Sequence, residues 1–296
     1  MAAAPKARRG PLDPKPQRIS PVSSLPEIVI EAGKSERHYW RDLWRYRELF
    51  YFLAWRDILV RYKQTAIGLA WALVRPLFTI IVFTLIFGRL ARLPSEGAPY
   101  SALVLVGMIP WQFFASAVNE ASLGLANKEN IITKVYFPRI IIPISGAIVN
   151  LVELAVGLAM LAVLLAWQQV AVTLNMLFLP LILLPALLLT FGCAVWVSAL
   201  SVRFRDFRQV VPFALQMGLY ISPIAYSAAI IPERWRVWYA LNPFTGIIEG
   251  LRWSVFASSP TPPLQELAIS LGIATLATAS GIAYFRSIEK RFAELL

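Results

Sequence analysis

Residues 174–200 read LNMLFLPLILLPALLLTFGCAVWVSAL, without one charged side chain. The hydrocarbon core of a bilayer is about 30 Å thick, and a helix of about 20 mostly apolar residues crosses it. Since residues 174–200 exceed that length, they predict a transmembrane helix.

Five more stretches are mostly apolar and long enough to cross a bilayer. The whole chain agrees with them, because 58% of its 296 residues are hydrophobic and 15% are charged, whereas soluble domains have about 45–50% and about 25%. The sequence therefore predicts an all-α integral membrane protein whose transmembrane domain occupies residues 68–296. The six expected spans are 68–88, 101–123, 141–166, 174–200, 209–231 and 264–285.

Basic residues predict the orientation, because Lys and Arg accumulate in cytoplasmic segments. With the N-terminus inside, 22 of the 28 Lys and Arg residues lie on the inner side and five on the outer side, and Arg75 lies within the first span. We therefore expect both termini in the cytoplasm. The net charge of +11 then reflects topology and attraction to anionic lipid, so nucleic-acid binding is not expected.

The N-terminal part precedes the spans. Residues 1–26 are rich in proline and basic residues, which is typical of a disordered cytosolic tail. Within residues 27–67, the segment 39–63 combines charges with aromatic rings, and Trp and Tyr prefer the headgroup level. We predict an interfacial amphipathic helix, with a helix packed on the cytosolic ends of the bundle as the alternative. Its aromatic stripe consists of Trp44, Tyr51, Trp55 and Tyr62.

Two connecting segments are unusual for loops. Residues 124–140, on the inner side, lead from a polar run into an apolar, aromatic one, which lipid, the bundle or a partner protein should cover. Residues 231–263, on the outer side, are too polar to span the membrane but rich in aromatic rings. Asn242-Pro243 divides them, because the residue before proline is disfavoured in a helix. Two short helices are expected there, or an aromatic belt at the interface.

Arg75, Glu120 and Glu153 are ionisable residues that lie within or near the edge of the spans. Such residues are costly in hydrocarbon and usually face a bundle interior or a water-filled path. Arg75 and Glu120 are expected at similar depth, so we predict that they pair. Structural pairing or pore lining is favoured over a proton relay, which would need more such groups.

Motifs for catalysis or metal binding are scarce. The single cysteine and single histidine exclude a disulfide within the chain and a multi-histidine metal site. Residues 28–35, IVIEAGKS, end like a phosphate-binding loop, but Ile28 stands where that loop requires glycine. We expect no metal, no cofactor and no catalytic residue in this chain.

Five motifs follow one another as in a single family: RDILVRYKQTAIGLAWALVRP (56–76), GMIPWQFF (107–114), NIITKVYFPRIIIP (130–143), YISPIAY (220–226) and LNPFTGIIEGLRW (241–253). Over roughly residues 27–296 the chain resembles the membrane subunit of bacterial ABC-2 polysaccharide exporters. It looks most like the O-antigen and lipopolysaccharide exporters, with capsule and teichoic acid exporters close by. Arg75 departs from the family pattern, which has a neutral polar residue before the proline.

The resemblance implies a permease in the bacterial inner membrane that exports lipid-linked polysaccharide. It implies a homodimer with two copies of a separate ATP-binding subunit, in which ATP and magnesium act, so that this chain is not itself an enzyme. It also implies an interfacial helix at 39–63, a coupling helix at about 127–139 and two outer gate helices at about 232–258. The expected ATPase interface comprises Lys128, Glu129, Asn130, Ile131, Lys134, Tyr136, Phe137, Pro138 and Arg139.

A glycan path needs weak and repeated contacts, because a tight site would stall the polymer. Aromatic rings offer flat platforms to the CH-rich faces of sugars, although each ring is also compatible with packing or an interfacial belt. Two other hypotheses stay open: an ABC-2 exporter of drugs or simple lipids, with fewer aromatic rings along its path, and a membrane-embedded glycan-modifying enzyme, with a histidine or acidic cluster at one face. The channel and gate candidates are Trp71, Phe78, Tyr220, Tyr226, Trp235, Trp238 and Trp253.

Overall fold

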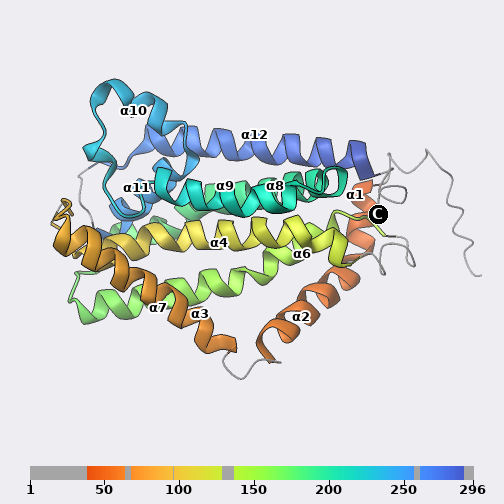
Figure 1. Ribbon diagram of the computed structural model, residues 1–296, viewed down its shortest axis with the longest axis horizontal. Helices are drawn as coiled ribbons and strands as arrows, with labels where there is room; N and C mark the ends of the chain where they lie inside the picture. Colours follow the sequence, from red (N-terminus) through yellow and green to blue (C-terminus); the bar gives the residue numbers. More distant parts are fainter. Residues whose placement is uncertain (1–38, 64–67, 96, 129–136, 257–260, 290–296) are drawn as a thin grey trace, which may run out of the picture. The chain divides into compact units, whose positions relative to one another are not determined.

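A computed structural model describes residues 39–63, 68–95, 97–128, 137–256 and 261–289. The chain divides into residues 1–39 and 40–296, and the second unit holds the helical bundle (Figure 1). The helices in chain order are α1 (Tyr39–Arg45), α2 (Arg47–Lys63), α3 (Gly68–Phe83), the π-helical η2 (Thr84–Leu90), α4 (Tyr100–Asn127), α6 (Ile141–Val149), α7 (Leu151–Trp167), the 3-10 helix η3 (Leu174–Phe178), α8 (Leu179–Arg203), α9 (Phe207–Ile221), the 3-10 helix η4 (Ala228–Ile230), α10 (Glu233–Ala240), α11 (Pro243–Phe256) and α12 (Leu264–Glu289).

Every regular element in the described ranges is a helix, so the all-α prediction is confirmed for them. Five of the predicted spans coincide with helices that are long and apolar enough to cross a membrane. These helices follow the apolar runs because a chain in hydrocarbon must satisfy its backbone hydrogen bonds internally. The five are Leu73–Leu90, Tyr100–Asn127, Ile141–Trp167, Leu174–Arg203 and Leu264–Glu289.

The prediction for residues 209–231 is corrected by the structure. In place of a 23-residue helix, α9 has 15 residues and is therefore about 22 Å long. It ends where Ser222 turns to an extended conformation, with ψ 148°. The cause is local, because Pro223 follows, and the residue before a proline is pushed out of the helical region.

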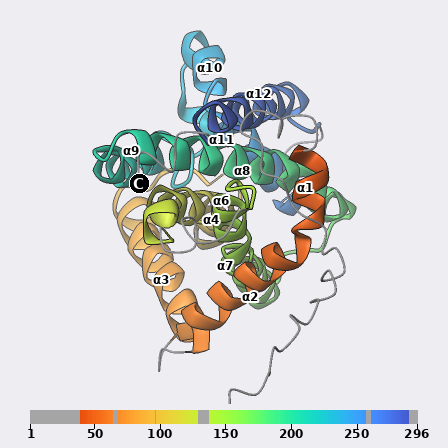
Figure 2. The ribbon, with the colours of Figure 1, turned by 90° about the vertical axis from the view of Figure 1, so that its right-hand side faces the viewer.

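The helix α4 lies inside the bundle. In its most apolar window 72% of the residues are buried, compared with 11% in Leu73–Leu90. Seen along the helices, α4 is surrounded by α3, α7, α8 and α9 (Figure 2). The side chains of α4 therefore meet most of the other helices, whereas α3 leaves much of its apolar surface exposed.

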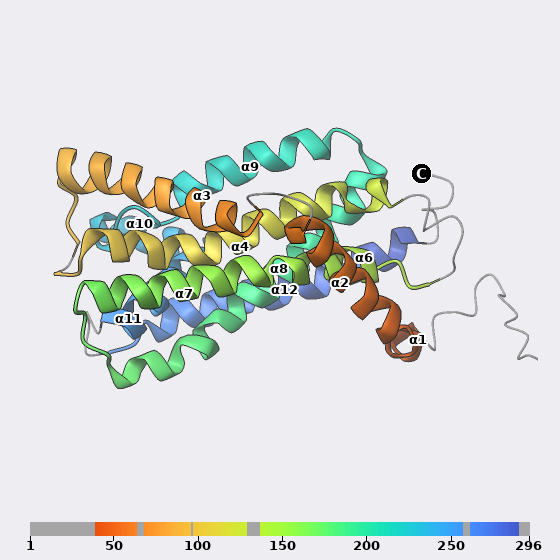
Figure 3. The same ribbon diagram turned by 90° about the horizontal axis from the view of Figure 1, so that it is seen from below.

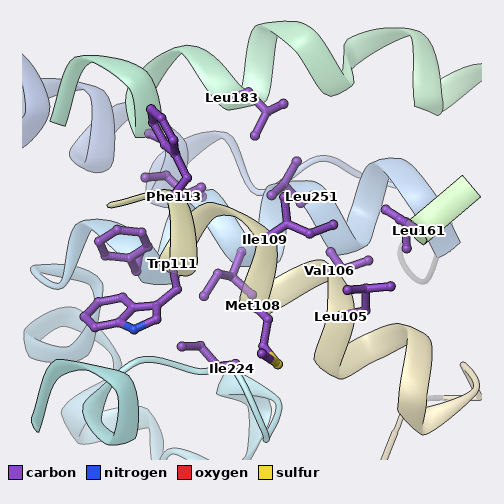
Figure 4. Packing of buried hydrophobic residues seen from close by; sticks show 14 of the residues in the cluster. Leu105, Val106, Met108, Ile109, Trp111, Phe113, Leu161, Leu183, Ile224 and Leu251 are labelled. Atoms are coloured by element: carbon purple, nitrogen blue, oxygen red, sulfur yellow. The ribbon is translucent and has the colours of Figure 1, made fainter. Parts of the chain in front are cut away.

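The hydrophobic core is centred on the first half of α4. The rings of Trp111 and Phe114 meet the ring of Phe244 in α11, at centroid distances of 4.8 Å and 5.0 Å, in the tilted geometries that aromatic pairs prefer. The core thereby ties α11 to α4. Figure 4 shows the surrounding packing, with Leu105, Val106, Met108, Ile109 and Phe113 of α4 beside Leu161, Leu183, Ile224 and Leu251.

Small residues allow α8 and α12 to approach closely. A Cβ atom added at Gly192 would lie 2.7 Å from the backbone of Thr278, and one added at Gly281 would lie 2.6 Å from the carbonyl oxygen of Gly192. Close approach at small residues is a common way to pack transmembrane helices. The pair α8–α12 therefore depends on the two glycines.

Two features break the regular bundle. The helix α2 runs obliquely to the long helices (Figure 3) and packs on α6, with Leu53 and Ala54 buried. The span made of α6 and α7 is interrupted at Asn150, whose backbone N–H bonds to Ala147 O at 3.2 Å. Asn150 is 0% exposed, so its amide requires partners inside the protein.

Candidate functional site

A cavity of about 780 Å³ lies among α2, α3, α4, α7 and α9. The longest wall of this cavity belongs to α4. Residues three and four apart share one face of a helix. The cavity-lining residues of α4 follow that spacing, namely Leu105, Met108, Ile109, Trp111, Gln112, Ala115, Ser116 and Asn119.

The wall made by α4 changes character along the helix. Leu105, Met108 and Ile109 are apolar, whereas Gln112, Ser116 and Asn119, about one to three turns further on, carry amides and a hydroxyl. Such a surface offers hydrogen bonds at one end and dispersion contacts at the other. A ligand that combines hydroxyls with CH-rich faces matches both parts of this wall.

Arg61, near the C-terminal end of α2, is the centre of a charged group of side chains. Its Nη1 atom lies 3.3 Å from Glu120 Oε2 and 3.9 Å from Glu153 Oε1, and it donates a hydrogen bond to Asn150 Oδ1 at 2.9 Å. Asn150 Nδ2 donates to Glu120 Oε2 at 2.9 Å. These four residues, the Arg61 cluster, join α2 to α4 and to the break between α6 and α7.

The predicted pair between Arg75 and Glu120 is therefore wrong. Glu120 is paired with Arg61, which reaches it from α2. Arg75 is exposed on α3 and lines the cavity, and within the described part of the chain no carboxylate forms an ion pair with it. Glu153, the third of these residues, pairs with Arg61 at 3.9 Å and lies in the cavity wall.

A second ion pair fixes α2. Lys128, just after α4, pairs at 2.5 Å with Asp57, which lies one turn before Arg61 on α2.

Tyr62 follows Arg61 on α2. Burial, and next the negative charge of Glu153, raise the pKa of Tyr62. Tyr62 therefore keeps its phenolic proton at neutral pH, and its side chain lines the cavity.

A second arginine group lies beside α11. Arg252, on α11, is 4% exposed in its side chain and pairs with Glu249 at 3.0 Å. It also donates hydrogen bonds to the backbone oxygens of Tyr226 at 3.0 Å and of Ile224 at 3.1 Å. Arg252, Glu249 and these two carbonyls form the Arg252 cluster, which holds the loop that follows α9.

Tyr226, in this loop, and Tyr239, on α10, connect the loop to α10 through hydrogen bonds. The hydroxyl of Tyr239, on α10, donates to Ile221 O at 2.8 Å and lies 2.9 Å from the hydroxyl of Tyr226. Burial, and next the hydrogen bond with Tyr226, raise the pKa of Tyr239, so it stays a neutral donor. The end of α9 is thereby fastened to α10.

The predicted channel aromatics lie in different places. Phe78 is 65% exposed on the outer face of α3, and Tyr220 is 57% exposed at the end of α9. Tyr226 belongs to the loop described above, and the side chain of Trp71 lies outside the described part. A tryptophan that was not among the candidates, Trp111, lies in the cavity wall.

The predicted gate residues Trp235, Trp238 and Trp253 also lie in different environments. Residues 233–256 form two helices, α10 and α11, which meet at Leu241 and Asn242. Trp235 and Trp238 are 52% and 66% exposed on α10. Trp253, on α11, packs instead against the core and lies 6.0 Å from the ring of Phe178.

The aromatic stripe expected on residues 39–63 is present in part. Trp44, Tyr51 and Trp55 are exposed by 71%, 68% and 50%, and the rings of Tyr51 and Trp55 are stacked at 6.4 Å. Tyr62 is at the cavity instead. The segment is divided into α1 and α2 at Tyr46.

The predicted coupling segment is described at its edges. Glu129, Asn130, Ile131, Lys134 and Tyr136 lie outside the described residues. Phe137 and Pro138 are buried within the chain, so of the coverings that the sequence left open, the bundle is the one observed for Phe137. Arg139 donates from Nη1 to the carbonyl oxygen of Glu289 at 2.8 Å, which ties the segment to α12.

Several functional candidates were missed by the sequence reasoning. Asn150 and Arg252 are the clearest, since a polar side chain in a strongly apolar run was a usable signal. The amides and hydroxyl at Gln112, Ser116 and Asn119 repeat at helical spacing, which also could have predicted a polar stripe. Within the described ranges, no group of three His, Cys, Asp or Glu residues is placed to hold a metal ion.

Comparison with known proteins agrees with this architecture. The chain matches the family described as ABC-2 type transporter over residues 48–256. An O-antigen export system permease protein RfbA of Klebsiella pneumoniae is 27% identical over 242 residues, which is 81% of this chain and 92% of that protein. The protein of the same name from Myxococcus xanthus is 25% identical over 257 residues, or 86% and 97% of the two chains. The chain belongs to the ABC-2 type transporter family.

Proposed function

We propose that this chain is the permease subunit of an ATP-driven exporter that carries lipid-linked, O-antigen-like polysaccharide across a bacterial inner membrane. The observation that carries the proposal is the cavity wall of α4, whose apolar and polar halves suit a sugar polymer better than a purely apolar substrate. The names of the relatives support the same substrate class.

The proposal includes a topology. Counting α9 with the loop that follows it, the chain crosses the membrane six times with both termini in the cytoplasm. The cavity is then one half of a path that a second copy completes, since α3 and α9 line it and also expose apolar side chains such as Phe78 and Phe213. Energy comes from ATP and magnesium in two copies of a separate ATP-binding subunit.

The remaining roles follow from placement. The segment around 128–139 docks on the ATP-binding subunit, through Lys128, Lys134 and Tyr136 rather than through the buried Phe137. The helices α10 and α11 lie at the end of the bundle opposite α1 (Figure 1), and they serve as outer gate helices. Trp235 and Trp238 then offer their rings to the emerging glycan, while Trp253 holds α11 in place.

Deletion of this chain tests the proposal. A strain without it should keep making lipid-linked polymer, which accumulates in the cytoplasm while the surface loses it. Re-expression should restore surface polymer. Absence of the polymer from every compartment would instead support a glycan-modifying enzyme, and unchanged surface polymer would support export of another substrate.

A further inference from the structure

The two arginines of the cavity wall differ in their partners. Arg61 is engaged with Glu120, Glu153 and Asn150. Arg75 is exposed in the same wall and has no carboxylate partner among the described residues. A guanidinium is ionised at all physiological pH values, and a charge within a membrane span is costly unless it meets water or an anion. Arg75 can therefore stabilise an anion that enters the cavity.

The surroundings of Arg75 supply further hydrogen-bond donors. Gln112, Ser116 and Asn119 on α4 and Gln216 on α9 line the same cavity. The hydroxyl of Tyr62 is buried and has no hydrogen-bond partner within the described ranges. Amides and hydroxyls of this kind commonly complete the coordination of a phosphate whose charge an arginine balances.

The other faces of α3 indicate that the anion carries hydrocarbon. Arg75, Pro76 and Thr79 line the cavity, whereas Leu77 and Phe78 are exposed by 46% and 65%. Arg75 thus lies on the boundary between the cavity and the apolar outside of the bundle. It also lies seven residues from the start of α3, or about 10 Å along the helix. A ligand with an anionic head and apolar tails can place its head in the cavity and leave its tails in the bilayer.

We propose that Arg75 is the anchor of a binding site for the phosphate groups of the lipid carrier of the exported polymer. The inference rests on the proposed function and adds to it the chemistry of the recognised head, a lipid-linked phosphate or diphosphate. Arg75 binds it through two N–H donors, and the polar stripe of α4 receives the sugars that follow.

Direct binding to the purified full-length permease tests the site without transport. Farnesyl diphosphate is the probe, and native mass spectrometry gives its affinity. Arg75→Gln should weaken binding about tenfold, because hydrogen bonds to a charged group are lost, and Arg75→Lys should weaken it less, because the charge stays but the planar fork does not. The matched control is Arg89→Gln, an exposed arginine further along the same span, which should bind normally. Equal affinities for the wild type and Arg75→Gln would overturn the site.

Three comparison ligands identify what the site recognises. Farnesol, which lacks the phosphates, should bind the wild type and Arg75→Gln equally. Inorganic diphosphate should bind weakly, and affinity equal to that of the farnesyl compound would overturn the lipid assignment. Arg75-dependent binding of phosphatidylglycerol as tight as that of farnesyl diphosphate would overturn the assignment to the substrate carrier in favour of bulk lipid.

A double variant separates ligand binding from charge balance within the wall. If Arg75 merely offsets the charge of Glu153, then adding Glu153→Gln to the Arg75→Gln variant should restore wild-type affinity for farnesyl diphosphate. That result would contradict the site. The site predicts that the double variant still binds farnesyl diphosphate weakly. Failure of these binding tests leaves the deletion experiment untouched, so the loss of the site and the loss of the proposed function are distinguishable.

Discussion

The Arg61 cluster and the Arg252 cluster each join an arginine to acidic side chains, but their partners differ in kind. Arg252 is 4% exposed in its side chain and bonds to two backbone carbonyls as well as to Glu249. Arg61 is 35% exposed in its side chain, and it contacts the side chains of Glu120, Asn150 and Glu153. Backbone carbonyls cannot move without moving a loop, whereas side chains can change rotamer.

The difference indicates two roles for similar chemistry. The Arg252 cluster fixes the loop after α9, because its buried guanidinium bonds to two backbone carbonyls of that loop. The Arg61 cluster borders the cavity and links α2, whose Asp57 pairs with Lys128 beside the proposed docking segment. It can therefore rearrange while the transporter works, since its ion pairs are partly solvated and individually weak.

The largest effect is expected at the Arg252 cluster. Arg252→Ala removes the guanidinium that bonds to Glu249 and to two carbonyls, and removing one partner of a buried pair costs about 4 kcal/mol. The thermal midpoint of the purified permease and its level in membranes should both fall sharply. Arg236→Ala, on the exposed face of α10, is the control and should leave both unchanged. An Arg252→Ala protein as stable as the control would mean that this cluster is not a structural anchor.

A smaller loss is expected at Trp253, which follows Arg252 in α11 and packs against the core. Trp253→Ala should destabilise the protein by about 3 kcal/mol through lost core contacts. Trp253→Phe should be close to neutral, because it keeps an aromatic ring and removes an indole N–H that has no partner among the described residues.

The double change Trp235→Ala and Trp238→Ala should lower export at unchanged stability. Thermal unfolding and surface glycan per inserted permease measure the two effects, and a stable Trp253→Ala protein with impaired export would return Trp253 to the gate.

The smallest effect on stability is expected at the Arg61 cluster. Arg61→Gln should cost about 1 kcal/mol, because the ion pairs are about one-third exposed and screened by solvent. This cost should shrink at high salt, while that of Arg252→Ala should not. Thermal unfolding of both variants at low and high ionic strength makes the comparison. Equal salt dependence would erase the distinction between the clusters.

Much of the fold could be predicted from the sequence, because the length of an apolar run is a local property. The run at 174–200 and the helices η3 and α8 (174–203) nearly coincide. The early end of α9 could also have been predicted from the sequence, because Pro223 disfavours a helical conformation at Ser222. The break at Asn242-Pro243 was predicted from the same rule and separates α10 from α11.

Partners that are distant in sequence could not be predicted. Glu120 was expected to pair with Arg75 of the first span, because the two residues were placed at similar depth. The oblique course of α2 brings Arg61 to Glu120 instead, across 59 positions. In the same way, nothing local to Phe137 reveals that it is buried. Such contacts depend on how the helices pack, and the apolar pattern leaves that open.

The central claim is that glycan passes along the polar stripe of α4. Ser116→Trp fills the cavity from that stripe, and Ala159→Trp adds the same ring to an exposed position on α7 outside the cavity wall. The measurement is surface glycan per inserted permease in a strain that lacks the native copy. We expect Ser116→Trp to leave the polymer inside the cell and Ala159→Trp to export normally. Normal export through the Ser116→Trp permease would contradict the account.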